Sequence, residues 1–161
     1  MRTYQPQDKD AIIKMIDSIY REYGDKIYLE GADSDLLDIE ANYLQDGEFW
    51  VEEGDTGQII ACIAVKRSLN SSKELAASLK RFYVLPEYRG SGIAQQMHNT
   101  VIEWCKENYI NQIYLWSDTR FTRAHSFYSK HGYEKKGIRD MNDGAMPYQE
   151  YYFVKKIIIY K

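Results

Sequence analysis

The sequence lacks the features that mark a secreted, membrane-spanning or metal-binding protein. It has only two cysteines, Cys62 and Cys105, and no Cys/His spacing typical of a metal site. No apolar run approaches the length of a membrane-spanning helix, and the first residues lack the apolar core of a signal peptide. We therefore expect a cytoplasmic protein with free, buried thiols, no bound metal and no membrane association.

The sequence also has no large excess of charge of one sign and no stretch with the composition of a linker. The formal net charge is −3 at pH 7, which disfavours a general role in nucleic-acid binding. Only three prolines are present, no Pro/Ser/Gly-rich stretch divides the chain, and no repeat is evident. With 44% hydrophobic residues the chain can pack a core, so we expect residues 1–161 to form a single domain.

Helical and strand patterns alternate along the chain. Apolar residues at three-and-four spacing between Ile12 and Tyr23 predict a helix that ends at Gly24. The remaining patterns predict a short helix from Ser34, a hairpin formed by 49–51 and 59–65, a long strand over 75–85, a helix after it, a strand over 110–116, a short helix around 124–131 and a last strand over 151–160. This order is typical of a mixed α/β domain.

The most informative stretch is an anion-binding pattern at the end of the long strand. An apolar run ends at Val84, and Arg89, Gly90 and Gly92 then precede a helical pattern. Glycines let backbone N–H groups face inward, and the helix adds its positive N-terminal end. Seen alone, the glycines could equally make a structural turn. The stretch lacks the Gly-Lys-(Ser/Thr) of a P-loop and the third glycine of a dinucleotide fingerprint.

Two motifs together resemble the GNAT superfamily of acyl-CoA N-acyltransferases. Arg89, Gly92 and Ala94 match its pyrophosphate signature (Arg/Gln)-x-x-Gly-x-(Gly/Ala). The stretch from Ala124 to Tyr133 is similar to a second motif, Ala-x-x-Phe-Tyr-x-x-x-Gly-(Phe/Tyr). The motifs occur in the family's order and spacing, and the resemblance covers roughly residues 3 to 157.

This resemblance implies the GNAT fold, a central, mostly antiparallel sheet that is splayed at the long strand and flanked by helices. It also implies acetyl-CoA as cosubstrate, with pantetheine pairing against the splayed strand and pyrophosphate held by the glycine loop. The residues that it assigns to acetyl-CoA are Phe82, Tyr83, Val84, Arg89, Gly90, Ser91, Gly92, Ile93, Ala94, Ala124, Phe127 and Tyr128.

The resemblance assigns catalytic roles to two of these residues. The backbone N–H of Val84 would donate to the thioester oxygen, and Tyr128 would protonate the departing thiolate, although a tyrosine on a helix face can also be a core residue. The general base stays open, because Ser78 occupies a position where many members have glutamate. The candidates for a base reached through water are Glu30, Asp118 and Asp140.

Charge placement gives a prediction for the acceptor. Residues 25–55 contain eleven acids and one base, Lys26, on what would be the acceptor side. The basic residues expected near the cofactor are Arg120, Arg123, Lys130, Lys135 and Lys136. This distribution favours a small cationic amine as acceptor, unless the charges only cover solvated faces. The segment 139–148 has the composition of a flexible loop that forms a substrate wall.

The sequence therefore predicts a cytoplasmic N-acetyltransferase that acetylates a primary amine by direct attack in a ternary complex. One alternative is a CoA-binding sensor or interaction module that has lost turnover. Another is an acetyltransferase that acts on protein N-termini or lysines. The apolar run 157–160 could be an edge strand covered in a homodimer, or the last strand of the core.

Overall fold

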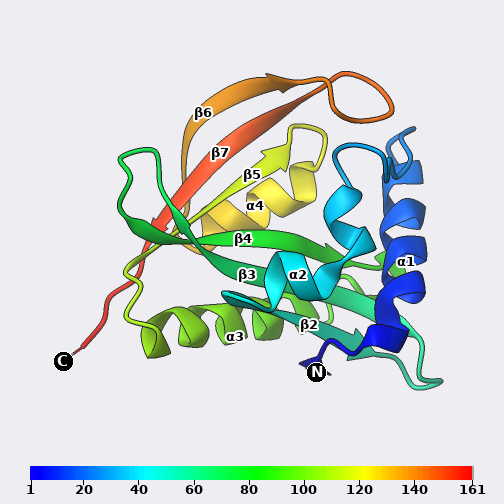
Figure 1. Ribbon diagram of the computed structural model, residues 1–161, viewed down its shortest axis with the longest axis horizontal. Helices are drawn as coiled ribbons and strands as arrows, with labels where there is room; N and C mark the ends of the chain where they lie inside the picture. Colours follow the sequence, from blue (N-terminus) through cyan, green and yellow to red (C-terminus); the bar gives the residue numbers. More distant parts are fainter. Residues whose placement is uncertain (161) are drawn as a thin grey trace.

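The computed structural model describes residues 1–160 and has one seven-stranded sheet with helices on both faces (Figure 1). The strand order is β1-β2-β3-β4-β5-β7-β6, and every neighbouring pair is antiparallel except β4 and β5. The strands are β1 (Arg2–Thr3), β2 (Gly47–Glu53), β3 (Ile59–Leu69), β4 (Leu75–Val84), β5 (Gln112–Asp118), β6 (Glu134–Met141) and β7 (Tyr148–Lys156). The predicted mixed α/β class and mostly antiparallel sheet are confirmed.

Within residues 1–160, four α-helices and three short 3-10 segments complete the fold. They are η1 (Pro6–Asp8), α1 (Lys9–Arg21), η2 (Ser34–Leu37), α2 (Ile39–Tyr43), η3 (Pro86–Tyr88), α3 (Ile93–Glu107) and α4 (Thr122–Lys130). α1 buries Ile12, Ile16 and Ile19 on one face, as the helical spacing predicts, and then unwinds through a turn to Gly24. None of the helices in residues 1–160 has the length and apolar character needed to cross a membrane.

The sheet separates two apolar cores. One lies against α3 and α4 and includes Ile63, Leu79 and Met97, and the other lies against α1 and α2 and includes Ile12 and Phe49. Because successive side chains of a strand point to opposite faces, β3 supplies residues to both cores and is buried along most of its length. The two cysteines are free and buried, as expected, one in each core.

The C-terminal strands differ from the sequence expectation. The segment from Glu134 to Met141 forms β6, and β7 ends at Lys156, so part of the predicted loop 139–148 is strand. β6 carries mostly exposed, polar side chains at the sheet edge and therefore has no apolar alternation to reveal it. Residues 157–160 lie outside the sheet: Ile157 packs on the α3 core, and Ile158 and Tyr160 are exposed.

β4 diverges from β5 after only two paired positions, Ala77 with Ile113 and Ser78 with Tyr114. A bulge interrupts the pairing of β4 with β3 between Cys62 and Ala64, and on β4 the backbone of Arg81 has a positive φ of 49°. The predicted splay at the long strand is therefore present, and it opens the far half of β4 to the interior of the fold.

Candidate active site

Two cavities meet at the splayed end of β4. The first has a volume of about 440 Å³ and borders the loop 89–94, and we call it the loop cavity. The second has a volume of about 410 Å³ and lies among β4, β5, the β6–β7 loop and the segment 20–43, and we call it the polar cavity. Phe82, Tyr83, Ala124 and Tyr128 line both cavities. A molecule bound in one cavity can therefore reach a molecule bound in the other at these residues.

The loop cavity has the features of an anion site. Gly90 and Gly92 have φ angles of 78° and 93°, and Gly92 is the N-cap of the fifteen-residue helix α3. Arg89, Arg123 and Lys130 line the cavity, and no acidic residue of the described chain lines it. The cavity thus combines a glycine turn, a helix N-terminus and an excess of positive charge, which fit a phosphorylated ligand.

Arg89 fixes the loop to its surroundings. Its Nε donates to the carbonyl oxygen of Val84 at 3.0 Å, and its two terminal nitrogens donate to the carboxylate of Glu22 at 2.9 and 3.0 Å. Ser91 adds a bond from its hydroxyl to the Tyr88 carbonyl. In this structure the guanidinium therefore joins the loop to the end of β4 and to the turn after α1.

The end of β4 presents backbone groups to the cavities. Leu85 N–H donates to the Ile60 carbonyl at 2.9 Å, so Leu85 faces β3. Backbone groups alternate in an antiparallel pair, so the N–H of Val84 faces the opposite side, where β5 has diverged. The bond from Arg89 to the Val84 carbonyl lies on that side as well. The Val84 N–H is therefore directed toward the splay.

Tyr128 lies at the junction of the two cavities. Its side chain is buried and packs at edge or tilted angles against Phe82, Tyr133 and Phe153. Among the described residues its hydroxyl has no hydrogen-bond partner. Burial, with a smaller contribution from Tyr83, raises the pKa of Tyr128 above its usual value. The phenol is thus neutral near pH 7 and free to donate a proton.

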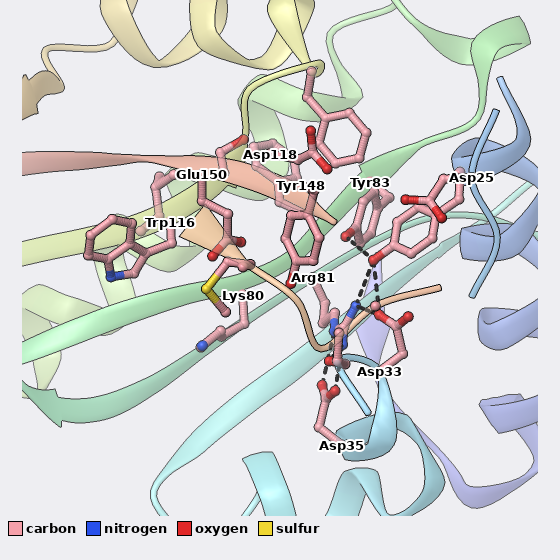
Figure 2. A pocket seen from close by; sticks show the side chains of 18 of the residues that line it. Asp25, Asp33, Asp35, Lys80, Arg81, Tyr83, Trp116, Asp118, Tyr148 and Glu150 are labelled. Carbon is pink, nitrogen blue, oxygen red and sulfur yellow. Dashed lines mark hydrogen bonds and ion pairs between the residues drawn. The ribbon is translucent and has the colours of Figure 1, made fainter. Parts of the chain in front are cut away.

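A buried ion-pair network forms one wall of the polar cavity (Figure 2). Arg81 donates to Asp33 at 2.9 Å and also contacts both oxygens of Asp35. The Tyr20 hydroxyl donates to Asp33 and lies 3.1 Å from the Tyr83 hydroxyl. The side chains of Arg81 and Asp33 are only 10% and 4% exposed, so this network is part of the interior.

Three further acids of the polar cavity are also paired with arginines. Arg120 bridges Asp118 and Asp25, and Arg139 binds Glu150. Figure 2 shows Asp25, Asp118 and Glu150 around the same cavity. The β6–β7 loop closes this wall, because the Ala32 N–H donates to the Asp143 carbonyl at 2.8 Å. The cavity is therefore highly charged, and five of its carboxylates are neutralised by arginines of the protein.

A family model described as "Acetyltransferase (GNAT) domain" matches residues 45–135. The chain belongs to the GNAT acetyltransferase family. It is 29% identical over 138 residues to an uncharacterized N-acetyltransferase of Escherichia coli, YjgM, and the match covers 83% of this chain and 81% of that one. It is 32% identical to rat N-acetyltransferase family 8 member 2 over 65% of this chain, and it spans about half of that relative's length, 46%.

Solved structures agree with this membership. An acetyltransferase of the GNAT family from Staphylococcus aureus superposes with a TM-score of 0.80 at 29% identity, and the match covers 97% of each chain. The chain is thus an N-acetyltransferase by family, and GNAT acetyltransferases take their acetyl group from acetyl-CoA. The loop cavity, with its glycine turn and basic lining, fits the phosphates of that cosubstrate.

Ten of the twelve residues assigned to acetyl-CoA line the loop cavity, whereas Ser91 and Ile93 do not. Of the five basic residues expected on the cofactor side, Arg123 and Lys130 line the loop cavity. Arg120 does not, because it reaches across the polar cavity to Asp25. Lys135 instead lies over the ring of Tyr151 at 3.7 Å. Segment 139–148 does form a wall of the polar cavity, although its first residues belong to a strand.

The structure places the three candidates for the general base in different surroundings. Asp118 lines the polar cavity, where it is bound to Arg120. Glu30 does not line either cavity, and Asp140 lies on the exposed face of β6, where it accepts from Gln149. Asp118 is therefore the member of this set that adjoins the junction.

Sequence reasoning missed the residues at the centre of the polar cavity. Lys80 and Arg81 line it, together with Tyr20 and Tyr83. The available signal was the pair of adjacent charges, Lys80 and Arg81, inside an otherwise apolar strand. Such a pair does not fit regular alternation and indicates a bulge.

Proposed function

We propose that this GNAT enzyme transfers the acetyl group of acetyl-CoA to a primary amine by direct attack within a ternary complex. The observation that carries the proposal is the meeting of the loop cavity and the polar cavity at the splay of β4, where Phe82 and Tyr128 line both. Acetyl-CoA supplies the activated thioester from the loop cavity. The acceptor amine approaches from the polar cavity, so the two reactants meet without a covalent enzyme intermediate.

The residues of the loop cavity hold the donor. The N–H groups of Gly90 to Ala94 and the start of α3 bind pyrophosphate, with Arg123 and Lys130 adding positive charge. In this assignment Arg89 acts mainly by holding the loop to Val84 and Glu22. Phe127, which packs edge-on against Phe82, and Ala124 pack against pantetheine.

Val84 and Tyr128 act on the reacting groups. The backbone N–H of Val84 is a fixed dipole directed into the splay, and it stabilises the oxygen on which negative charge develops during attack. Tyr128 protonates the leaving thiolate. Because burial raises the pKa of its phenol, Tyr128 carries its proton throughout the neutral range in which the reaction proceeds.

Two routes can take the proton from the attacking amine. Asp118 adjoins the junction and could accept it through water, although Arg120 stabilises its charged form. A second route starts at the Tyr83 hydroxyl, which contacts Tyr20, and Tyr20 in turn contacts Asp33. Burial raises the pKa of Tyr83 to about 12, so the two tyrosines would pass the proton along without holding a charge, and the Asp33 carboxylate would accept it at the end of the chain. We favour the tyrosine chain because it begins at a residue that lines both cavities.

The structure changes the basis for predicting the acceptor. Of the eleven acids in residues 25–55, only Asp25, Asp33 and Asp35 line the polar cavity, and an arginine binds each. The excess of free negative charge that favoured a cationic amine is therefore absent from this cavity. Relatives include N-acetylaspartate synthetases of Xenopus tropicalis and Danio rerio, 29% and 28% identical, whose name denotes an acetylated amino acid. An amino-acid-like acceptor is compatible with this cavity.

The test combines binding and turnover. Titration of acetyl-CoA in a calorimeter, with NAD as control, should show one saturable site, and free thiol should appear when amines are added. Tyr128→Phe should lower kcat by about 10²-fold with unchanged acetyl-CoA affinity. Tyr109→Phe, at a side chain that is 82% exposed, is the matched control and should leave both unchanged. Binding without thiol release across all amines would favour the CoA sensor, and full activity of Tyr128→Phe would remove Tyr128 from the mechanism.

A further inference from the structure

Every carboxylate that lines the polar cavity already has a partner in the protein. Five of the six are in ion pairs: Asp33 and Asp35 with Arg81, Asp25 and Asp118 with Arg120, and Glu150 with Arg139. The sixth, Asp143, accepts from the Tyr148 hydroxyl at 2.6 Å. A cationic group of a substrate would have to displace one of these partners, which costs free energy when the pair is desolvated.

Two cations that line the polar cavity, Lys26 and Lys80, have no ion pair and no side-chain hydrogen bond within residues 1–160, and of these two Lys80 lies on β4, the strand that leads to the junction. Within residues 1–160 its ammonium has no carboxylate within 4.0 Å and no hydrogen-bond partner. The neighbouring Lys66, in contrast, donates to the Asn42 carbonyl at 3.0 Å. In Figure 2 the amino end of Lys80 lies apart from the network of Arg81, Asp33 and Asp35. Lys80 is thus a cation that is open to the cavity and available to a ligand.

The surroundings of Lys80 favour a bound anion. The side chain of Lys80 is exposed at the cavity, and partial desolvation there, reinforced by the nearby positive charge of Arg81, lowers the pKa of Lys80 below its usual value. The charged form is therefore less stable here than in water. A carboxylate placed against the ammonium would restore that stability, whereas Asp35 and Glu150 favour the charged form only from a distance and neither is in contact with it.

The position of Lys80 relative to the junction sets the size of the ligand. Lys80 and Val84 lie on the same strand, and four residues of strand span about 13 Å. The bulge at Arg81 turns Lys80 and Arg81 toward the polar cavity, while Phe82 lies at the junction. The lysine side chain and a small acceptor can together span this distance, so that the amine of the acceptor lies at the splay.

We propose that Lys80 binds a carboxylate of the acceptor, so that the enzyme acetylates amines that also carry a carboxylate, as amino acids do. This inference rests on the proposed function and makes its substrate class more specific. The amine is directed to the thioester at the junction, and the carboxylate is held by the Lys80 ammonium, which has no partner within residues 1–160.

The test compares each amino acid with its own carboxamide, since the pair differs mainly in the carboxylate. Glycine, aspartate, glutamate, methionine and phenylalanine are assayed with acetyl-CoA for thiol release, beside their α-carboxamides and a diamine. The wild type should prefer the acid in at least one pair. In Lys80→Met, kcat/KM for that acid should fall by about 10- to 100-fold, the value expected for loss of a hydrogen bond to a charged group, and the amide should change little.

Two further variants distinguish direct contact between Lys80 and the carboxylate from a general effect of positive charge in the cavity. Lys80→Arg keeps the cation and should retain most of the preference for the acid. Lys66→Met also removes a charge from the same cavity. Because the Lys66 ammonium already donates to the Asn42 carbonyl, this variant should preserve the preference for the acid. Equal loss in Lys66→Met and Lys80→Met would overturn the inference, as would a wild type that prefers amides or the diamine.

Binding measurements keep this inference distinct from the proposed function. The same acids and amides are titrated in a calorimeter against the protein saturated with CoA, for wild type and Lys80→Met. Acids that bind the wild type and not Lys80→Met, without any thiol release, would support the role of Lys80 while the transferase proposal fails. Absence of any preference for the acids, in binding and in turnover alike, would refute the role of Lys80 even in an active enzyme.

Discussion

Replacing Arg81 with methionine should destabilise the protein far more than replacing a comparable surface arginine. Methionine keeps much of the side-chain length but leaves Asp33 and Asp35 without their cation. Breaking a buried ion pair from one side costs about 3–5 kcal/mol, and the Tyr20 hydroxyl and Tyr28 N–H still support Asp33, so we expect the lower end, about 3 kcal/mol. At this chain length that corresponds to a fall in Tm of about 10 °C.

The control is Arg139→Met, because Arg139 also binds a carboxylate, that of Glu150, but its side chain is 40% exposed. Exposed pairs contribute about 0–1 kcal/mol. Both variants and the wild type are unfolded in urea at pH 7, with the Tm measured in parallel. A free energy of unfolding for Arg81→Met within about 0.5 kcal/mol of the control would refute the assignment of Arg81 as the cation that stabilises this wall.

The same variant has a pH dependence with a definite sign. Burial alone would raise the pKa of Asp35, but the bonds and charge of Arg81 and the Tyr43 hydroxyl lower it overall, below 3.8. A carboxyl whose pKa is lower in the folded state contributes stability above its unfolded pKa and loses it as pH falls through its folded pKa. Without Arg81, burial raises the pKa of Asp35, so the difference between wild type and Arg81→Met should be full at pH 7 and shrink steadily as the pH falls through the acidic range. A difference that stays constant down to pH 3 would contradict this account.

Three other perturbations have clear expected outcomes. Gly92→Ala should cost about 1–2 kcal/mol through its positive φ and weaken acetyl-CoA binding, while Gly57→Ala, at a φ of 82° in the β2–β3 turn, should cost the same and leave that affinity unchanged. Tyr83→Phe should lower kcat by about 10²-fold without changing the KM for acetyl-CoA, and an unchanged kcat would exclude the tyrosine chain as proton path. Burial raises the pKa of Cys62 and of Cys105 to about 12, so a thiol reagent at pH 8 should react only after denaturation, and rapid labelling of the native protein would contradict their burial.

The parts of the fold that follow local rules could be predicted from the sequence. α1 was evident because its apolar residues recur at helical spacing, and the loop 89–94 because glycines precede a helical pattern. β6 was missed because its side chains are polar and exposed at a sheet edge, so burial leaves no pattern in its sequence. Its strand character depends on pairing with β7, which the residues of β6 alone do not encode.

The charges of the site could not be predicted by counting along the chain. The acids of residues 25–55 suggested a negatively charged pocket, but Asp33 and Asp35 are bound by Arg81, which lies almost fifty residues later. Asp25 is bound by Arg120, ninety-five residues away. A local excess of one charge therefore says little about the field inside a cavity, since the neutralising groups arrive from distant elements.

The bulge in β4 is reflected in the parity of the core residues on that strand. Before the bulge Ala77 and Leu79 face the α3 core, at odd positions, and after it Phe82 and Val84 face the same core, at even positions. Regular alternation cannot satisfy both pairs, so one extra residue must lie between Leu79 and Phe82. That requirement places Lys80 and Arg81 together on the opposite face. The bulge thus places side by side Arg81, the cation that holds the cavity wall, and Lys80, the cation that we assign to the acceptor.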